Sequence, residues 1–204
     1  MTQEEKTRRT KERILQSAIK EFGTKGYTAA TIGTICKEYG IAKGLLYHNF
    51  SGKEDLYLAC VSRCFDEVVD YLQKQEFGTN LQRYMESRFQ FFSTFPLHAG
   101  IFFEAVLQPP AGLELEIKER KKKFDQYNQR IYRNALAQLT LRKGVTEKDA
   151  LEYYEIMQEM FNGYFSSPAY ASKEFHFLMA DHEERLSKTL DFMLYGIVER
   201  STEE

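Results

Sequence analysis

The sequence lacks tryptophan and has only 4 prolines and 3 cysteines among its 204 residues. The first proline is Pro96, so no proline interrupts a helical pattern before that position. The cysteines, Cys36, Cys60 and Cys64, form no C-x-x-C pair and are too few for a disulfide scaffold. These absences favour a helical protein in a reducing, cytoplasmic setting, with Cys60 and Cys64 as small core residues.

Long apolar runs are also missing. No run approaches the roughly 20 residues that span a bilayer, and the N-terminal stretch has no signal-peptide core. The four histidines form no H-x-x-x-H pair, and no Glu-x-x-His occurs. We therefore expect no secretion, no membrane partner, no metal and no cofactor.

The near-neutral net charge of −2 hides an asymmetry. Residues 1–53 hold 10 Lys and Arg against 5 Asp and Glu, a net of +5, and the remaining residues hold 18 against 25, a net of −7. A basic N-terminal quarter on an acidic body indicates that one end of the chain meets a polyanion.

Apolar residues recur at helical spacing along the whole chain, and no stretch alternates as a strand does. Gly26 is read as a helix stop, Ser51 and Glu54 as a capping box, and Asp181 as a weaker helix start. The sequence therefore predicts an all-α protein. The predicted helices cover approximately residues 7–25, 31–39, 42–49, 52–75, 80–94, 97–107, 113–142, 147–166 and 182–199.

Residues 31–49 have the layout of a helix-turn-helix, in which a short helix, a glycine turn and a second short helix follow one another. The spacing Cys36-x-x-x-Gly40 places a small side chain where the helices approach and a glycine in the turn. The segment 42–49 would then enter the major groove of DNA.

Residues 22–58 closely resemble the DNA-binding domain of TetR-family bacterial transcriptional regulators. The resemblance rests on Thr31-Ile32-x-x-Ile35, on the run from Gly40 to Phe50, and on Ser51-Gly52-Lys53-Glu54-Asp55-Leu56. It implies about nine helices, a homodimer, a DNA-reading domain at 1–52 and, joined by a long helix, an effector-binding and dimerisation domain at 53–204.

The resemblance also implies roles for individual residues in DNA binding. Thr31, Lys43, Tyr47, His48 and Lys53 would contact phosphates, and Gly44 and Leu45 would face base edges. Hydroxyl and amine donors suit phosphate, and Leu45 can read only a thymine methyl. Two further basic residues belong either to a minor-groove arm or to a solvated tail: Arg8 and Arg9.

Two positions depart from the usual pattern of the family. Ala42 stands where serine is usual, so the recognition helix lacks a side-chain cap, at a cost of about 0.5–2 kcal/mol. Asn49 replaces an aromatic residue or histidine.

Aromatic residues of the C-terminal part, together with Glu104 in an apolar segment, predict a mainly apolar effector cavity that accepts an apolar or aromatic, cationic molecule. Each can equally be a core residue, and Glu104 can be exposed or salt-bridged. The candidate pocket residues are Cys64, Phe89, Phe92, Phe103, Glu104 and Tyr127.

Two C-terminal segments carry apolar stripes wide enough for partner helices, although an intramolecular core would give the same pattern. The resemblance favours a four-helix dimer interface. Its candidate residues are Tyr154, Phe161, Phe165, Leu190, Leu194 and Ile197.

The sequence therefore predicts a cytoplasmic, homodimeric repressor that a small molecule releases from a palindromic operator. Two alternatives stay open: a helical-bundle enzyme or ligand carrier, and a DNA-binding protein without an effector. The enzyme is disfavoured because no nucleophile with its base and no phosphate-binding glycine loop is found.

Overall fold

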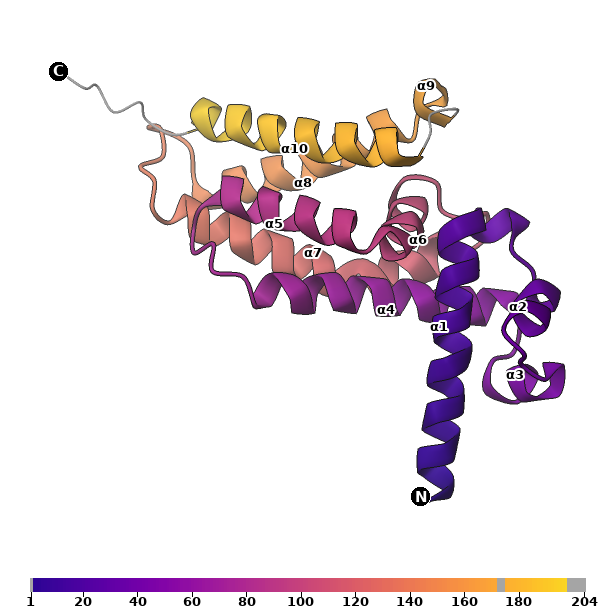
Figure 1. Cartoon of the computed structure of the whole chain (residues 1–204). Helices are drawn as coiled ribbons and strands as arrows, with labels where there is room; N and C mark the ends of the chain where they lie inside the picture. Colours follow the sequence, from indigo (N-terminus) through magenta and orange to yellow (C-terminus); the bar gives the residue numbers. More distant parts are fainter. Residues whose placement is uncertain (1, 172–174, 198–204) are drawn as a thin grey trace. The chain divides into compact units, whose positions relative to one another are not determined.

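The computed structural model describes residues 2–171 and 175–197, and its regular elements are helices (Figure 1). The all-α prediction is confirmed. The described residues form ten helices: α1 (Gln3–Ala29), α2 (Ile32–Glu38), α3 (Lys43–Asn49), α4 (Lys53–Gln73), α5 (Leu81–Thr94), α6 (Pro96–Leu107), α7 (Glu114–Leu136), α8 (Glu147–Phe165), α9 (Pro168–Ala171) and α10 (Phe175–Ile197).

The chain divides into two compact units. Unit 1 comprises residues 1–67 and 92–122, and unit 2 comprises residues 68–91 and 123–204. Three helices, α4, α5 and α7, contribute residues to both units. Unit 1 thus includes α6 together with the helices of the N-terminal quarter.

Unit 1 is built on close packing of α1 against α6. The apolar face of α1 predicted from the spacing, including Ile14, Ala18 and Phe22, is buried. A Cβ atom added to Gly23 would lie 2.4 Å from the carbonyl oxygen of Leu97, and one added to Gly100 would lie 2.6 Å from that of Gly23. Only glycine permits backbones to approach this closely.

The predicted helix stop at Gly26 is a kink. Gly26 has a φ of 72°, and the chain continues for a further turn as far as Ala29. Positive φ favours glycine, so the first helical run of α1 ends at Gly26, as predicted, and one further turn follows the kink.

Unit 2 contains a buried ion pair. Arg88 on α5 and Glu183 on α10 are almost fully buried and share two hydrogen bonds, of 2.9 and 2.8 Å. Burial opposes ionisation, but the Arg88 guanidinium lowers the pKa of Glu183 to about 2. In the same unit, Tyr132 stacks on Tyr154 with ring centroids 4.4 Å apart.

Two predicted helix signals are wrong. Ser51 pairs with Asp55, whose carboxylate accepts the Ser51 N–H at 2.9 Å, and not with Glu54. This follows because α4 begins at Lys53, which makes Asp55 its third residue. Asp181 does not start a helix, because α10 already begins at Phe175.

Two helix boundaries also differ. The segment predicted to run to residue 142 ends at Leu136, where Gln138 and Leu139 donate to carbonyls only three residues back and so tighten the chain into turns. Pro168 starts the short helix α9, which lies between the predicted helices 147–166 and 182–199. Proline fits a first helical turn because its missing N–H needs no acceptor there.

Candidate functional site

The second and third helices of unit 1 form the predicted helix-turn-helix. The hydroxyl of Thr31 accepts the Thr34 N–H at 3.0 Å and so caps α2. Gly40, with a φ of 61°, turns the chain, and the Ile41 N–H then donates to the carbonyl of Cys36 at 2.9 Å. These bonds satisfy both ends of α2 and place the start of α3.

Arg13 of α1 forms hydrogen bonds to the backbone of this turn. Its Nη2 donates to the carbonyls of Tyr39 at 3.0 Å and Gly40 at 3.1 Å. Arg13 was not among the residues predicted from the sequence, and no local signal reveals it, because its partners lie 26 and 27 residues further along the chain.

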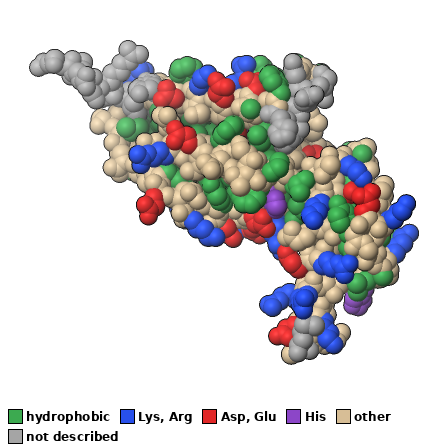
Figure 2. Space-filling model, viewed as in Figure 1, with side chains coloured by type: hydrophobic (Ala, Val, Ile, Leu, Met, Phe, Trp, Pro, Cys, Tyr) green, Lys and Arg blue, Asp and Glu red, His purple; other side chains and the backbone are tan. Residues whose placement is uncertain are grey.

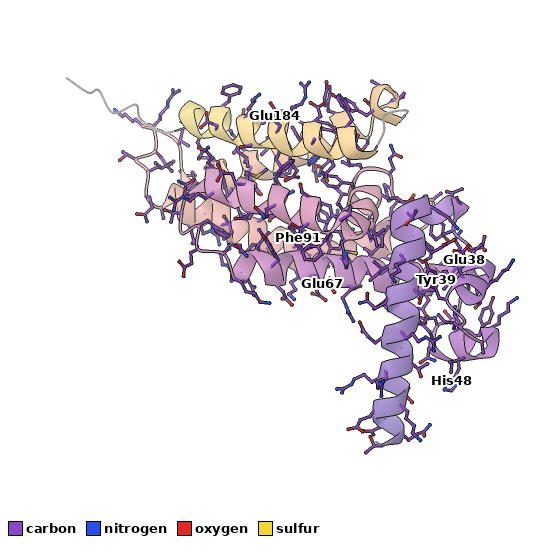
Figure 3. The ribbon with its side chains drawn as sticks, in the orientation of Figure 1. Glu38, Tyr39, His48, Glu67, Phe91 and Glu184 are labelled. Atoms are coloured by element: carbon purple, nitrogen blue, oxygen red, sulfur yellow. The ribbon has the colours of Figure 1, made fainter. Side chains whose placement is uncertain are left out.

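The helix α3 has one buried side and one exposed side. Leu46 is completely buried, whereas Leu45 and Tyr47 are 42% and 48% exposed. Lys43, Gly44 and His48 are exposed as well, and Figure 3 shows His48 on the outer side of this unit. A Cβ at Gly44 would meet no atom within 4 Å, so the glycine is not required by packing.

The two departures at α3 have different outcomes. Ala42 makes no side-chain cap, as predicted, and only its carbonyl takes part by accepting the N–H groups of Leu45 and Leu46. The Asn49 side chain donates to the carbonyl of Leu45 at 2.8 Å, so it satisfies an acceptor in the last turn of the helix.

Lys53 lies at the first residue of α4 and is half-buried. Its Nζ is 4.3 Å from the ring centroid of Tyr27 and 3.5 Å from the carbonyl oxygen of Thr28. To reach a phosphate it must leave these two partners, since a lysine head group can rotate on its long stem.

Arg8 and Arg9 are exposed residues of α1, whose first turns extend past α3 (Figure 1). Residues 3–29 are helical from a capping box between Thr2 and Glu5 onward. The arm is therefore a helix and not an extended strand. In Figure 2, Lys and Arg side chains gather over α1 to α3.

The six candidate pocket residues occupy different environments. Cys64, Phe92 and Phe103 are buried in unit 1, and burial raises the pKa of the Cys64 thiol. Tyr127 is buried in unit 2, and Phe89 is 44% exposed because α5 turns Arg88 and Phe91 inward.

The sixth candidate, Glu104, accepts hydrogen bonds within unit 1. Its Oε1 accepts the backbone N–H of Tyr27 at 2.8 Å, and its Oε2 accepts the hydroxyl of Tyr57 at 2.9 Å. Burial raises the pKa of Glu104, while the two hydrogen bonds and Lys53 act in the opposite direction. The structure therefore gives this carboxylate protein partners.

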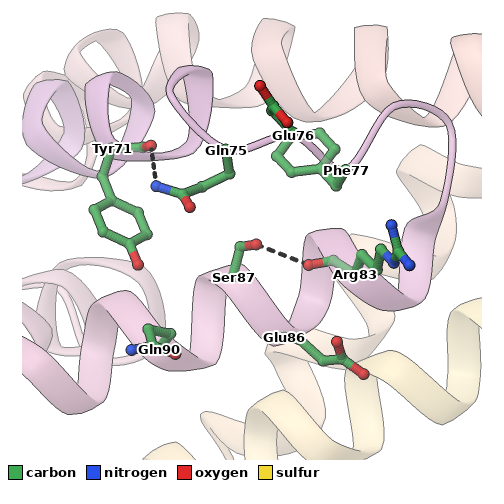
Figure 4. Close-up of a pocket in the computed structure, with 8 residues that line it drawn as sticks. All are labelled: Tyr71, Gln75, Glu76, Phe77, Arg83, Glu86, Ser87 and Gln90. Carbon is green, nitrogen blue, oxygen red and sulfur yellow. Dashed lines mark hydrogen bonds between the residues drawn. The ribbon is translucent and has the colours of Figure 1, made fainter.

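Two cavities lie in unit 2, and neither is lined by any of the six candidates. The first, of about 450 Å³, is a polar cleft between the end of α4 and α5 (Figure 4). Its lining consists of Tyr71, Gln75, Glu76, Phe77, Arg83, Glu86, Ser87 and Gln90. The second, of about 420 Å³, is more apolar and is lined by Gly144, Val145, Asp149, Ala150, Tyr153, Met193 and Gly196.

The candidate interface residues divide by burial. Tyr154, Phe165 and Leu190 are buried within the chain itself, and Phe161 and Leu194 are half-buried. The side chain of Ile197 lies outside the described ones. The large exposed apolar residues of α8 are instead its neighbours on another face, namely Tyr153, Ile156, Met160 and Tyr164. The exposed apolar side chains of α8 thus lie about one residue before the predicted ones.

Comparison with known proteins gives matches over most of the chain. Residues 14–60 match the model of bacterial regulatory proteins of the tetR family, and residues 76–195 match that of the tetracyclin repressor-like C-terminal domain.

Among the described residues, no helix is long and apolar enough to cross a membrane.

The curated relatives match mainly in the N-terminal part. The chain is 37% identical over 62 residues to the biofilm operon icaADBC HTH-type negative transcriptional regulator IcaR of Staphylococcus epidermidis, covering 30% of this chain and 34% of that protein. For IcaR of Staphylococcus aureus strain Newman the identity is 31% over 85 residues, covering 42% and 45%. The chain therefore spans less than half the length of these relatives.

Solved structures share the fold over nearly the whole chain. The regulatory protein TetR from Rhodobacter sphaeroides has a TM-score of 0.61 at 15% identity, covering 92% of this chain and 98% of that one. The transcriptional regulator FadR from Bacillus subtilis, in complex with stearoyl-CoA, has a TM-score of 0.58 at 15% identity, covering 86% and 97%.

Proposed function

Because this chain belongs to the TetR family of bacterial regulatory proteins, we propose that it is a DNA-binding repressor released from its operator by a small molecule. The observation that carries the proposal is α3, whose apolar anchor Leu46 is buried while Lys43, Leu45, Tyr47 and His48 face solvent. A helix that packs on the protein with one side and exposes the other can enter the major groove.

The contacts divide by chemistry. Lys43, Tyr47, His48 and the N-terminal end of α2 at Thr31 supply donors for phosphates, which set the register of the protein on DNA. Gly44 lets the backbone approach, and Leu45 contacts a thymine methyl. Three further basic residues add to the salt-dependent part of binding: Lys53, Arg8 and Arg9.

We assign DNA reading to residues 1–52 and effector binding and dimerisation to residues 53–204. The exposed stripe on α8 supports a homodimer, because Tyr153, Ile156, Met160 and Tyr164 follow one another at spacings of three and four and lie on one face. Half-buried Phe161 and Leu194 border that interface. A two-fold dimer requires an approximately palindromic operator, with recognition helices about 34–36 Å apart or a multiple of this.

The effector acts by binding better to a conformation in which the recognition helices no longer match the groove spacing. The polar cleft of Figure 4, with charges of both signs from Arg83, Glu76 and Glu86, is a candidate entry for a polar effector. The buried aromatic residues Phe92 and Phe103 of unit 1 support the alternative of an apolar or aromatic, cationic effector, which has to open the core of that unit. Tyr127 is a separate candidate within unit 2. The chain acts in the cytoplasm, where bacterial DNA lies, and is not an enzyme.

The test is fluorescence anisotropy with DNA from upstream of the protein's own gene, measured at several salt concentrations. We expect Tyr47→Ala and Lys43→Ala to weaken binding. Lys43→Ala should also reduce the salt slope by about 1, because one phosphate is then no longer neutralised by a lysine. Lys148→Ala, at an exposed lysine of α8, is the matched control and leaves the slope unchanged.

The competing hypothesis is a helical enzyme or ligand carrier. It gains support if the purified protein shows no salt-sensitive binding to that DNA while Tyr47→Ala keeps its cellular effect. A protein that binds DNA but whose affinity no small molecule alters is a DNA-binding protein without an effector.

A further inference from the structure

A single carboxylate joins three helices of unit 1 at the kink of α1. Glu104 on α6 accepts the Tyr27 N–H of α1 at 2.8 Å and the Tyr57 hydroxyl of α4 at 2.9 Å. Tyr27 directly follows Gly26, where the backbone departs from helical geometry. The acceptor for this N–H therefore comes from α6, at the point where α1 changes direction.

Close packing fixes the position of that carboxylate. A Cβ on Gly26 would lie 2.9 Å from Glu104 Oε1, and one turn earlier the backbones of Gly23 and Gly100 touch. On α6 the two contact points, Gly100 and Glu104, are four residues apart and so lie on one face. The helix α6 thus contacts α1 on both sides of the kink.

The surroundings make the two hydrogen bonds difficult to replace. Tyr57 is completely buried, and its ring packs against Phe22 at 5.1 Å and Tyr27 at 4.9 Å between centroids. An apolar side chain in place of Glu104 would fill the space but leave the buried Tyr57 O–H and the part-buried Tyr27 N–H without this acceptor. Such unsatisfied groups cost more than the hydrogen bonds themselves contribute.

The kink determines where the chain enters the helix-turn-helix. Only Ala30 and Thr31 separate α1 from α2. The first part of α1 already holds α2, because Glu21 accepts the Thr34 hydroxyl at 2.7 Å and Arg13 binds the following turn. The end of α1 beyond Gly26 is held by Glu104.

We propose that Glu104 is a positioning residue for DNA binding. It fixes the direction in which the chain leaves α1 and thereby the orientation of α2 and α3 toward the operator. This role rests on the proposed function. In it, the Glu104 carboxylate links α6 to the DNA-reading helices and does not recognise the effector.

The experiment compares two substitutions at the same position. Glu104→Leu removes both acceptors, and we expect the operator Kd to rise at least about tenfold. Glu104→Gln keeps an acceptor for the Tyr27 N–H in its amide oxygen, and its NH2 can donate to the Tyr57 hydroxyl, so only the Tyr57 O–H loses its acceptor; we expect its Kd to rise by no more than about threefold. The matched control is Glu116→Leu at an exposed position of α7.

Hydrogen exchange of the amides of residues 26–50, measured without DNA, is the second readout. We expect faster exchange in Glu104→Leu and wild-type exchange in Glu104→Gln and Glu116→Leu. If Glu104→Leu shows wild-type exchange in this segment, or only a lower melting temperature with an unchanged Kd, the positioning role is refuted. If the wild type binds no operator, the proposed function fails, and the exchange result still tests the role of Glu104 in the helix-turn-helix.

Discussion

The buried pair of Arg88 and Glu183 permits a quantitative test of how unit 2 is held together. The perturbation is Glu183→Leu, which removes the two hydrogen bonds of 2.8 and 2.9 Å that Arg88, a residue only 4% exposed, makes with Glu183. Removing one member of a buried pair costs about 3–5 kcal/mol, because the remaining charge stays desolvated. For a chain of this length, that corresponds to a loss of about 6–20 °C in melting temperature.

The double substitution separates charge burial from packing. In Arg88→Met with Glu183→Leu, both desolvation penalties disappear, so most of the lost stability returns. The recovery is incomplete by about 1 kcal/mol, since His182 Nδ1, 3.1 Å from Glu183 Oε1, loses that hydrogen bond.

The pH dependence has a definite sign. The pKa of Glu183 is lowered in the folded protein to about 2. Its contribution to stability is therefore present above its unfolded pKa, about 4.3, and is lost as the pH falls from there toward 2. The double variant has no such carboxylate and loses less stability over this range.

The assay is urea unfolding followed by circular dichroism for the wild type, the single variant and the double variant, at neutral pH and at steps down to pH 3. The reasoning is refuted if Glu183→Leu costs less than about 1 kcal/mol. It is also refuted if the double variant is no more stable than the single one.

Three further predictions concern unit 1 and the exposed face of α8. Arg13→Met frees the turn of the helix-turn-helix and should weaken operator binding about tenfold with an unchanged salt slope, measured by anisotropy. Gly23→Ala forces a Cβ against Leu97 and should lower the free energy of unfolding in urea by at least about 2 kcal/mol. The control Gly163→Ala, whose Cβ would have no atom within 4 Å, should be neutral or stabilising by up to about 1 kcal/mol. Equal effects of the two substitutions would contradict the packing argument. Light scattering should give the mass of the proposed homodimer for the wild type and that of a monomer for Met160→Glu, and an equal mass for both would exclude this face as the interface.

Local signals in the sequence predicted the helices well. The period of Ile14, Ala18 and Phe22 indicated the buried face of α1, and the layout of residues 31–49 indicated α2 and α3. These features depend on residues within one or two turns of each other, which a sequence displays directly. The boundaries failed where a signal was ambiguous, as at Asp181.

The candidate site was predicted unevenly for a physical reason. The exposed residues of α3 follow from a local pattern, because burial of Leu46 forces its neighbours outward. The apolar candidates for the pocket and the interface lie at helical spacing, and that pattern does not distinguish Phe92, buried in the core, from Phe89 at the surface. Helical period identifies a face but not the element that covers it.

The sequence by itself determined an all-α chain, a basic helix-turn-helix near its start and the family to which it belongs, because propensity, capping and motif spacing are local. Only the tertiary structure decided that Arg13 braces the turn, that Glu104 binds Tyr27 and Tyr57, and that Tyr154 is buried while Met160 is exposed. Those partners lie tens of residues apart in the chain. Packing brings them together, and the choice among helical faces depends on every neighbouring helix at once.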